Sequence, residues 1–567
     1  MVDNIYEEKR LDARRRRRDE VYATLPKVTI SAKAETGRVE SSIAVPEQRI
    51  YIGQKPVISA SLADTLCSAI GVRRLLDKLN ATLGISYTLD TPFLFSFLVE
   101  CTENNYDFGT AYCSLRDVWY TDDWSTIREE LRKRERKDQR ERREALDGNC
   151  VVQPHTSPRR VWDLYSNRVV PTWDTSPSKE LAPISHAWVH EKDRNDVWTP
   201  INGYEWPVPI PKDTNLDLIR IEMPLNLGAE YVWLDVLCLK QKGGRRYCLR
   251  EKEWELDVPT IGCVYYNTDK VYCYLSGLGR PLTLKEGDLE SDQCWFNRAW
   301  TLQEVGKKRI ICGQTLDGPM RAKGDKDRIY ETEILTRFHQ KLRDASAVLR
   351  YQEADVFRAL VEMQHRKSTK EVDKVMGLAF LLKASTIPAY SESQNLETAW
   401  TALVNTTSKR TRAVLFFHYP EPGNRGTKWR PSWDQVMTTD LPTFSDCQGS
   451  IDWTAEGNDH DRSRAPCIEK GLVRGLTMGG KGQHGELSVE DAHGRRHAFK
   501  ITATHSYPVP EKAYTLIGDN RLFYWVVGQR LSEKKFEKVS VIKIANSEEG
   551  KKLKELNIAK ERINILL

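Results

Sequence analysis

The chain has 567 residues, of which 40% are hydrophobic and 29% charged, so we expect a soluble globular protein of several domains. Its net charge of +6 is small beside 86 basic and 80 acidic residues, which argues against a general role in nucleic-acid binding. No apolar run approaches the ~18 residues that a membrane-spanning helix needs, and the N-terminus lacks the apolar core of a secretory signal. We therefore expect a cytoplasmic protein whose twelve cysteines are reduced and buried.

The first segment, residues 1–60, is predicted to be a basic, partly disordered arm. Five consecutive arginines run from Arg14 to Arg18, and prolines interrupt the stretch that follows. A charge block of this kind is typical of a solvated chain, with nuclear import or nucleic-acid binding as the alternative.

Residues 61–150 are predicted to form a helical region. Apolar residues recur at helical spacing between residues 61 and 89, which indicates amphipathic helices. Residues 125–147 are almost entirely Arg, Lys and Glu, and pairs of opposite charge on neighbouring turns stabilise such a helix in water. We expect a charged, solvated helix in this second stretch.

Residues 160–315 alternate short apolar runs with helical patterns, which predicts an α/β domain with a parallel sheet flanked by helices. Helices are expected over Glu253–Asn267 and Asp292–Lys307. The expected strands are Ala182–Ser185, Tyr231–Leu237, Val271–Leu275 and Arg309–Cys312.

Two further regions complete the predicted organisation. Residues 316–410 read as a helical extension, and residues 429–567 as a β-rich C-terminal domain. In the C-terminal domain, glycine-rich turns separate alternating strands such as His497–Ala503 and Lys538–Ile544, and a charged helix is expected near Lys551–Arg562.

A candidate site lies at one edge of the predicted parallel sheet. Ligands of open parallel sheets bind beyond the carboxyl ends of the strands, where Ser185 and Asp235 are expected. Trp300 and Glu304 are four positions apart, so on the expected helix they share a face. A glutamate in this pattern is more often a surface residue or the partner of a nearby arginine, and Arg298 is available for that role.

No metal or cofactor is expected. His186 and His190 have the spacing of zinc ligands on a helix, but they follow a strand and have no third ligand nearby. The stretch 475–482 imitates a phosphate-binding loop, but it lacks the Ser or Thr after the lysine and precedes a strand.

Three blocks of sequence together resemble the fungal heterokaryon-incompatibility (HET) domain, and they occur in the order that the family has. The resemblance covers residues 160–315, and the chain departs from the family pattern at Val189 and at Leu239-Lys240. The blocks are Ile184-Ser185-His186-Ala187-Trp188, Tyr231-Val232-Trp233-Leu234-Asp235-Val236-Leu237-Cys238 and Arg298-Ala299-Trp300-Thr301-Leu302-Gln303-Glu304.

The resemblance implies a TIR-like core with a TIR- or flavodoxin-like parallel sheet, and it implies a reaction. The third block contains Trp-x-x-x-Glu, which is similar to the pattern of TIR domains that cleave NAD between ribose and nicotinamide. Glu304 would then be the catalytic carboxylate that stabilises the positive charge developing on the ribose. Ser185 and Asp235 would bind ribose hydroxyls. The implied substrate-binding set is Ser185, Trp188, Asp235, Arg298 and Trp300, with NAD as a substrate rather than a cofactor.

The implied biological role is regulated cell death in fungal non-self recognition, carried out by a hydrolase that self-associates on activation. A protein partner is also expected, but the sequence does not identify it. The alternative is a non-catalytic, TIR-like signalling and assembly module. In that module Glu304 would pair with Arg298 or with a backbone group, and the same surfaces would mediate assembly.

Overall fold

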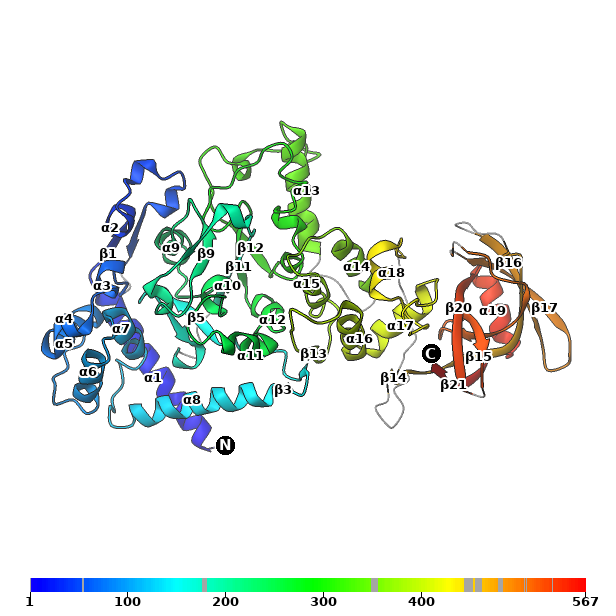
Figure 1. Cartoon of the computed structure of the whole chain (residues 1–567), viewed down its shortest axis with the longest axis horizontal. Helices are drawn as coiled ribbons and strands as arrows, with labels where there is room; N and C mark the ends of the chain where they lie inside the picture. Colours follow the sequence, from blue (N-terminus) through cyan, green and yellow to red (C-terminus); the bar gives the residue numbers. More distant parts are fainter. Residues whose placement is uncertain are drawn as a thin grey trace. The chain divides into compact units, whose positions relative to one another are not determined.

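The computed structural model describes residues 2–53, 56–175, 181–347, 355–442, 452–453, 461–477, 483–503, 505, 507–532 and 534–567. The chain divides into two compact units (Figure 1). Unit 1 comprises Met1–Leu349 with Ala389–Ser391, and unit 2 comprises Arg350–Pro388 with Glu392–Leu567. In the residues described, no helix is both long and apolar enough to cross a membrane.

The core of unit 1 is a six-stranded sheet in the order β12-β11-β7-β10-β5-β6. Neighbours among β12, β11, β7 and β10 are parallel, whereas β10 pairs with β5 and β5 with β6 in the antiparallel sense. The strands are β5 Arg160–Asp163, β6 Arg168–Pro171, β7 Leu181–His186, β10 Tyr231–Trp233, β11 Lys270–Tyr274 and β12 Lys308–Ile311.

The parallel part of this sheet confirms the α/β prediction and fixes the strand order. In chain order the parallel strands lie 2-1-3-4, because the chain moves from β7 to β10 on one side and then to β11 on the other. This reversal makes the carboxyl ends of β7 and β11 a topological switch point, where doubly wound sheets bind ligands. The predicted parallel sheet is part of a mixed one, because the hairpin β5–β6 adds antiparallel strands at one edge.

The prediction of a helix over Asp292–Lys307 is wrong. The structure has two short 3₁₀ turns there, η7 Trp295–Asn297 and η8 Trp300–Leu302. The Thr301 hydroxyl lies 2.5 Å from Trp295 O and 2.9 Å from Arg298 O, so it competes for acceptors that a regular helix would use.

The other connections of the sheet are helical but shorter than expected. The second strand ends at Trp233 and is followed by the helical turn α10 Asp235–Cys238, so Asp235 begins a helix. The helix expected over Glu253–Asn267 is two helices, α11 Cys248–Asp257 and α12 Ile261–Tyr266.

The N-terminal part of unit 1 has more regular structure than the sequence predicts. The arginine run lies in α1 Val2–Thr24, and a hairpin follows, β1 Val28–Ser31 with β2 Ile50–Gly53. Arg14 is buried, and its guanidinium pairs with Glu130 of α8 Ile127–Glu144, the charged helix beside α1 (Figure 1). A buried guanidinium needs such a partner, which sequence periodicity does not reveal.

Smaller elements complete unit 1. The expected amphipathic helices correspond to α3 to α5. The elements are α2 Ala32–Thr36, α3 Ala60–Ala63, α4 Cys67–Ile70, α5 Val72–Leu83, α6 Leu94–Glu103, α7 Phe108–Arg116, β3 Leu146–Asp147, β4 Cys150–Val151, β8 Arg194–Val197, β9 Val208–Pro211, α9 Leu216–Arg220, the π-helical turn η6 Ile221–Leu225 and α13 Glu333–Ala347.

Unit 2 combines helices with a C-terminal antiparallel sheet, in line with the predicted β-rich domain. The helical extension expected over 316–410 is divided, because α13 belongs to unit 1 and the later helices to unit 2. The elements of unit 2 are α14 Val356–Gln364, α15 Val372–Met376, β13 Ile387–Pro388, α16 Leu396–Thr406, α17 Lys409–His418, α18 Trp433–Thr438, β14 Asp452–Trp453, β15 Asp461–Arg474, β16 Gln483–Glu490, β17 Arg496–Ala503, β18 Lys512–Gly518, β19 Tyr524–Arg530, β20 Lys535–Ile544, α19 Ser547–Glu555 and β21 Lys560–Leu566.

Candidate functional site

Ser185 and Glu304 are in direct contact at the carboxyl end of β7. The Ser185 Oγ donates a hydrogen bond of 2.6 Å to Glu304 Oε2. It also accepts one of 2.7 Å from Trp295 Nε1 on η7. Ser185 and Trp295 are fully buried and Glu304 is half-buried. These hydrogen bonds fix the orientation of the Glu304 carboxylate against the end of a buried strand.

The face of the sheet under Glu304 is apolar and aromatic. Ser185 is paired in register with Cys273 of β11, and the Tyr265 hydroxyl of α12 donates to Ile184 O at 2.9 Å. Burial raises the pKa of Cys273 to about 12, and the negative charge of Glu304 contributes to the rise. Burial and then Glu304 likewise raise the pKa of Tyr265 well above its ordinary value. The carboxylate therefore lies close to this face in surroundings that screen its charge poorly.

A second polar cluster begins one residue further along β7. His186 points to the opposite face of the sheet, because successive side chains of a strand alternate. Its Nε2 lies 2.9 Å from Asp235 Oδ1, and Trp188 Nε1 donates to Asp235 Oδ2 at 3.1 Å. The His186 and Trp188 rings stack with centroids 5.5 Å apart. The Val236 backbone N–H also donates to Asp235 Oδ1 at 2.7 Å, which fixes the carboxylate at the start of α10.

The pKa of His186 is raised by this cluster. Burial alone lowers the pKa, but the charge of Asp235 and its hydrogen bond outweigh that effect, and Glu304 adds a smaller contribution. The imidazole therefore holds its proton more firmly than an ordinary histidine.

Two cationic side chains lie outside the parallel strands, one against Trp188 and one in the loop after α10. Arg194 of β8 lies over the Trp188 ring, with its Cζ 5.0 Å from the ring centroid. Lys240, in the loop after α10, is buried, and its Nζ is 3.8 Å from a Glu205 carboxylate oxygen. In the same loop a Cβ on Gly244 would lie 2.3 Å from Glu205 O, so this close approach requires glycine. The cation-rich loop thus packs against the segment around Glu205.

The structure unites the predicted site residues in two contacting pairs, Ser185 with Glu304 and Trp188 with Asp235. Arg298 and Trp300 are half-buried and lie on the turns that lead to Glu304. The prediction did not include His186, Trp295 or Arg194 in the site. Trp295 could have been predicted from the sequence, because a buried Trp usually donates its indole N–H to a partner. Arg194 could not, because it reaches the site only through the hairpin β8–β9.

Among the residues that the structure describes, no three His, Cys, Asp or Glu side chains gather where they could hold a metal ion. Comparison with known proteins adds no assignment: no family model, no curated protein and no solved structure matches the chain.

Proposed function

We propose that unit 1 is an enzyme of the doubly wound α/β class in which Glu304 acts as a fixed anion at the switch point of the sheet. The particular activity that we propose is an NAD glycohydrolase of the HET-domain type, with a TIR-like core, that triggers regulated cell death in fungal non-self recognition. The observation that carries the proposal is the hydrogen bond from Ser185 to Glu304 at the carboxyl end of β7.

The chemistry needs a negative charge that is already in place. As the bond from ribose C1′ to the nicotinamide nitrogen breaks, its electrons neutralise the pyridinium and positive charge develops on the ribose. Water then adds to C1′ and releases a proton to solvent, which gives ADP-ribose. A carboxylate held by Ser185 near C1′ lowers this barrier because it does not reorganise during the reaction.

Ser185 has a positioning role in this proposal. The resemblance implies that it binds a ribose hydroxyl, but its Oγ is buried and engaged by Trp295 and Glu304. Arg194 supplies a cation that suits the pyrophosphate of NAD, and Asp235, held by His186 and Trp188, remains the candidate for the ribose hydroxyls.

A second function, a non-catalytic signalling and assembly module, is favoured by the burial of this network. Ser185 is fully buried, and its two hydrogen bonds join the η7–η8 segment to β7. A glutamate that only anchors a connection between strands would make the same contacts.

The test is nicotinamide release from NAD by the full chain, at high concentration and with a crowding agent that promotes self-association. Glu304→Ala should lower kcat by roughly 10²–10³-fold, as removal of one preorganised electrostatic contact does elsewhere. Ser185→Ala should lower it less, because the carboxylate remains but its orientation is lost. Glu251→Ala, at an exposed position of α11, is the matched control and should retain wild-type turnover.

Unchanged unfolding curves must accompany the loss of activity, so that turnover and folding are separated. If assembled wild-type protein releases no nicotinamide, or if Glu304→Ala is as active as wild type, the enzyme proposal is rejected and the assembly module replaces it.

A further inference from the structure

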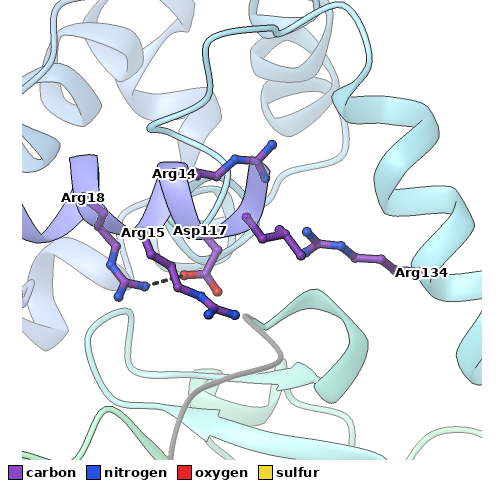
Figure 2. Close-up of a pocket in the computed structure, with 6 residues that line it drawn as sticks. Arg14, Arg15, Arg18, Asp117 and Arg134 are labelled. Carbon is purple, nitrogen blue, oxygen red and sulfur yellow. Dashed lines mark ion pairs between the residues drawn. The ribbon is translucent and has the colours of Figure 1, made fainter. Parts of the chain in front are cut away.

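A cavity walled by arginines lies between α1 and α8 in unit 1 (Figure 2). The space there is about 290 Å³, a figure that includes open solvent, so the enclosed part of the cavity is small. None of its residues belongs to the candidate site at the sheet edge. The lining residues are Leu11, Arg14, Arg15, Arg18, Asp117 and Arg134.

Among the described residues, three arginines at and beside this wall share one buried carboxylate. Arg10, Arg14 and Arg134 all pair with a single carboxylate, Glu130. Arg15 has Asp12 at 3.0 Å, but the Asp12 side chain is 54% exposed and therefore well screened. Asp174 also interacts with Arg134, but burial raises the pKa of Asp174 to about 7, so at neutral pH its charge is only partial. Guanidinium groups keep their charge at any physiological pH, and a bound anion would offset the remainder.

The other end of the cavity is closer to electrical balance. Arg18 lies 3.9 Å from Asp117, whose side chain is only 7% exposed, whereas its 2.9 Å pair with Asp19 is well screened because Asp19 is 66% exposed. Burial alone lowers the pKa of Arg18, but Glu230, Tyr22 and Asp117 raise it. An anion is therefore favoured at the end formed by Arg14, Arg15 and Arg134, whose guanidinium-bearing side chains extend from the two helices (Figure 2).

Buried hydrogen-bond donors at the end formed by Arg14, Arg15 and Arg134 also favour a bound anion. The Arg14 and Arg15 Nε atoms are buried and have no hydrogen-bond partner among the residues described. The Arg14 side chain is only 6% exposed, so water from the bulk does not satisfy it. A buried donor without a partner is destabilising, and an oxyanion with several acceptor oxygens would remove that penalty.

We propose that this cavity is a binding site for a compact phosphate-bearing anion, such as inorganic phosphate, pyrophosphate or the terminal phosphates of a small metabolite. The arginines of α1 and the arginine of α8 contact the anion from two sides. Guanidinium forks match phosphate oxygens in pairs, which suits a small tetrahedral group better than a long polymer. Bound anion thereby fastens α1 to α8. This site is independent of the proposed NAD reaction.

The experiment measures binding of inorganic phosphate and of pyrophosphate to the full chain by calorimetry, at constant ionic strength, with thermal unfolding in parallel. Wild type should bind pyrophosphate more tightly than phosphate and should melt at a higher temperature as either anion is added. Arg15→Gln and Arg134→Gln should each weaken binding by about tenfold, because each removes a charge-assisted contact.

Arg17→Gln and Arg140→Gln are the matched controls, since they remove the same charge from α1 and α8 at positions paired with exposed Asp122 and Glu144. Both should keep wild-type affinity within about twofold. If Arg15→Gln does not fold, Arg15→Lys keeps the charge but loses the fork, and should bind several-fold more weakly than wild type. Equal affinity in wild type and the cavity variants overturns the proposal. The proposal is also overturned if the same arginines bind DNA while the protein does not bind pyrophosphate.

Discussion

Ser185 and His186 are adjacent in β7, yet they hold two different carboxylates at the same end of the strand. Because strand side chains alternate, Ser185 contacts Glu304 on one face and His186 contacts Asp235 on the other. Each carboxylate is thus oriented by one residue of the same strand. The position of β7 in the middle of the sheet makes both orientations rigid.

The pairing of His186 with Asp235 predicts a stability that depends on pH. The folded-state pKa of His186 is raised, so its contribution is fully present below the unfolded pKa of about 6.5 and is lost as the pH rises through the folded pKa. Asp235→Asn should lower the free energy of unfolding by ~1–3 kcal/mol at acidic pH, and the difference should shrink at alkaline pH. Urea unfolding at several pH values measures it.

The control for this variant is His190→Asn, since His190 is exposed. It should leave the pH dependence of stability as in wild type. A difference between wild type and Asp235→Asn that stays constant across the pH range would contradict the assignment to His186.

At the scale of elements, a buried lysine joins β20 to the end of α17 within unit 2. The Lys538 Nζ donates to Phe416 O at 2.9 Å and to Tyr419 O at 2.6 Å, and Lys538 is 2% exposed. These carbonyls lie at the C-terminal end of α17, where helix acceptors lack partners within the helix. The lysine therefore completes the hydrogen bonding of a helix end from a distant strand.

Lys538→Met should change how the stability of unit 2 responds to pH. Burial lowers the pKa of Lys538 well below 10.5, so between the folded pKa and 10.5 the unfolded chain binds more protons and wild-type stability rises with pH. Relative to Lys538→Met, wild type should gain at most ~1.4 kcal/mol per pH unit in that window. Denaturant unfolding at neutral and at alkaline pH measures the gain.

Lys535→Met, at the exposed start of β20, is the matched control and should follow wild type at every pH. Parallel curves for wild type and Lys538→Met would show that the buried amine keeps its ordinary pKa, and the prediction would fail.

At the scale of the whole molecule, the chain passes through part of unit 2 and then returns briefly to unit 1. Ala389–Ser391 belong to unit 1, although their sequence neighbours on both sides belong to unit 2. Ala389 N donates to Asn149 O at 2.8 Å, and the buried Tyr390 ring lies 5.9 Å from that of Trp254. A fragment that ends at residue 349 therefore lacks part of the packing of unit 1.

Tyr390→Ala should destabilise unit 1 by ~2–5 kcal/mol and leave unit 2 unchanged, because it removes a buried aromatic ring. Hydrogen exchange separates the two effects. Amides of β10 and β11 should lose protection, while those of β19 and β20 should keep it. Tyr266→Ala, at a 58% exposed position of α12, is the control and should alter neither set. Equal loss of protection in both units would contradict the assignment of Tyr390 to unit 1.

The sequence by itself determined the local features of this protein. Apolar runs located the parallel strands and placed Ser185 within one residue of the end of the first, because burial on both faces leaves a local pattern. The resemblance that suggests an NAD reaction is likewise a pattern of local blocks, and that function stays a prediction.

Only the tertiary structure decided which side chains meet. Glu304 reaches Ser185 across 119 positions, and Asp235 reaches His186 across 49, through a strand order that periodicity does not encode. The 3₁₀ turns before Glu304 and the burial of Arg14 escaped prediction for the same reason. Both depend on hydrogen bonds and ion pairs with specific partners, whereas helix propensity and charge patterning report only what neighbours along the chain can do.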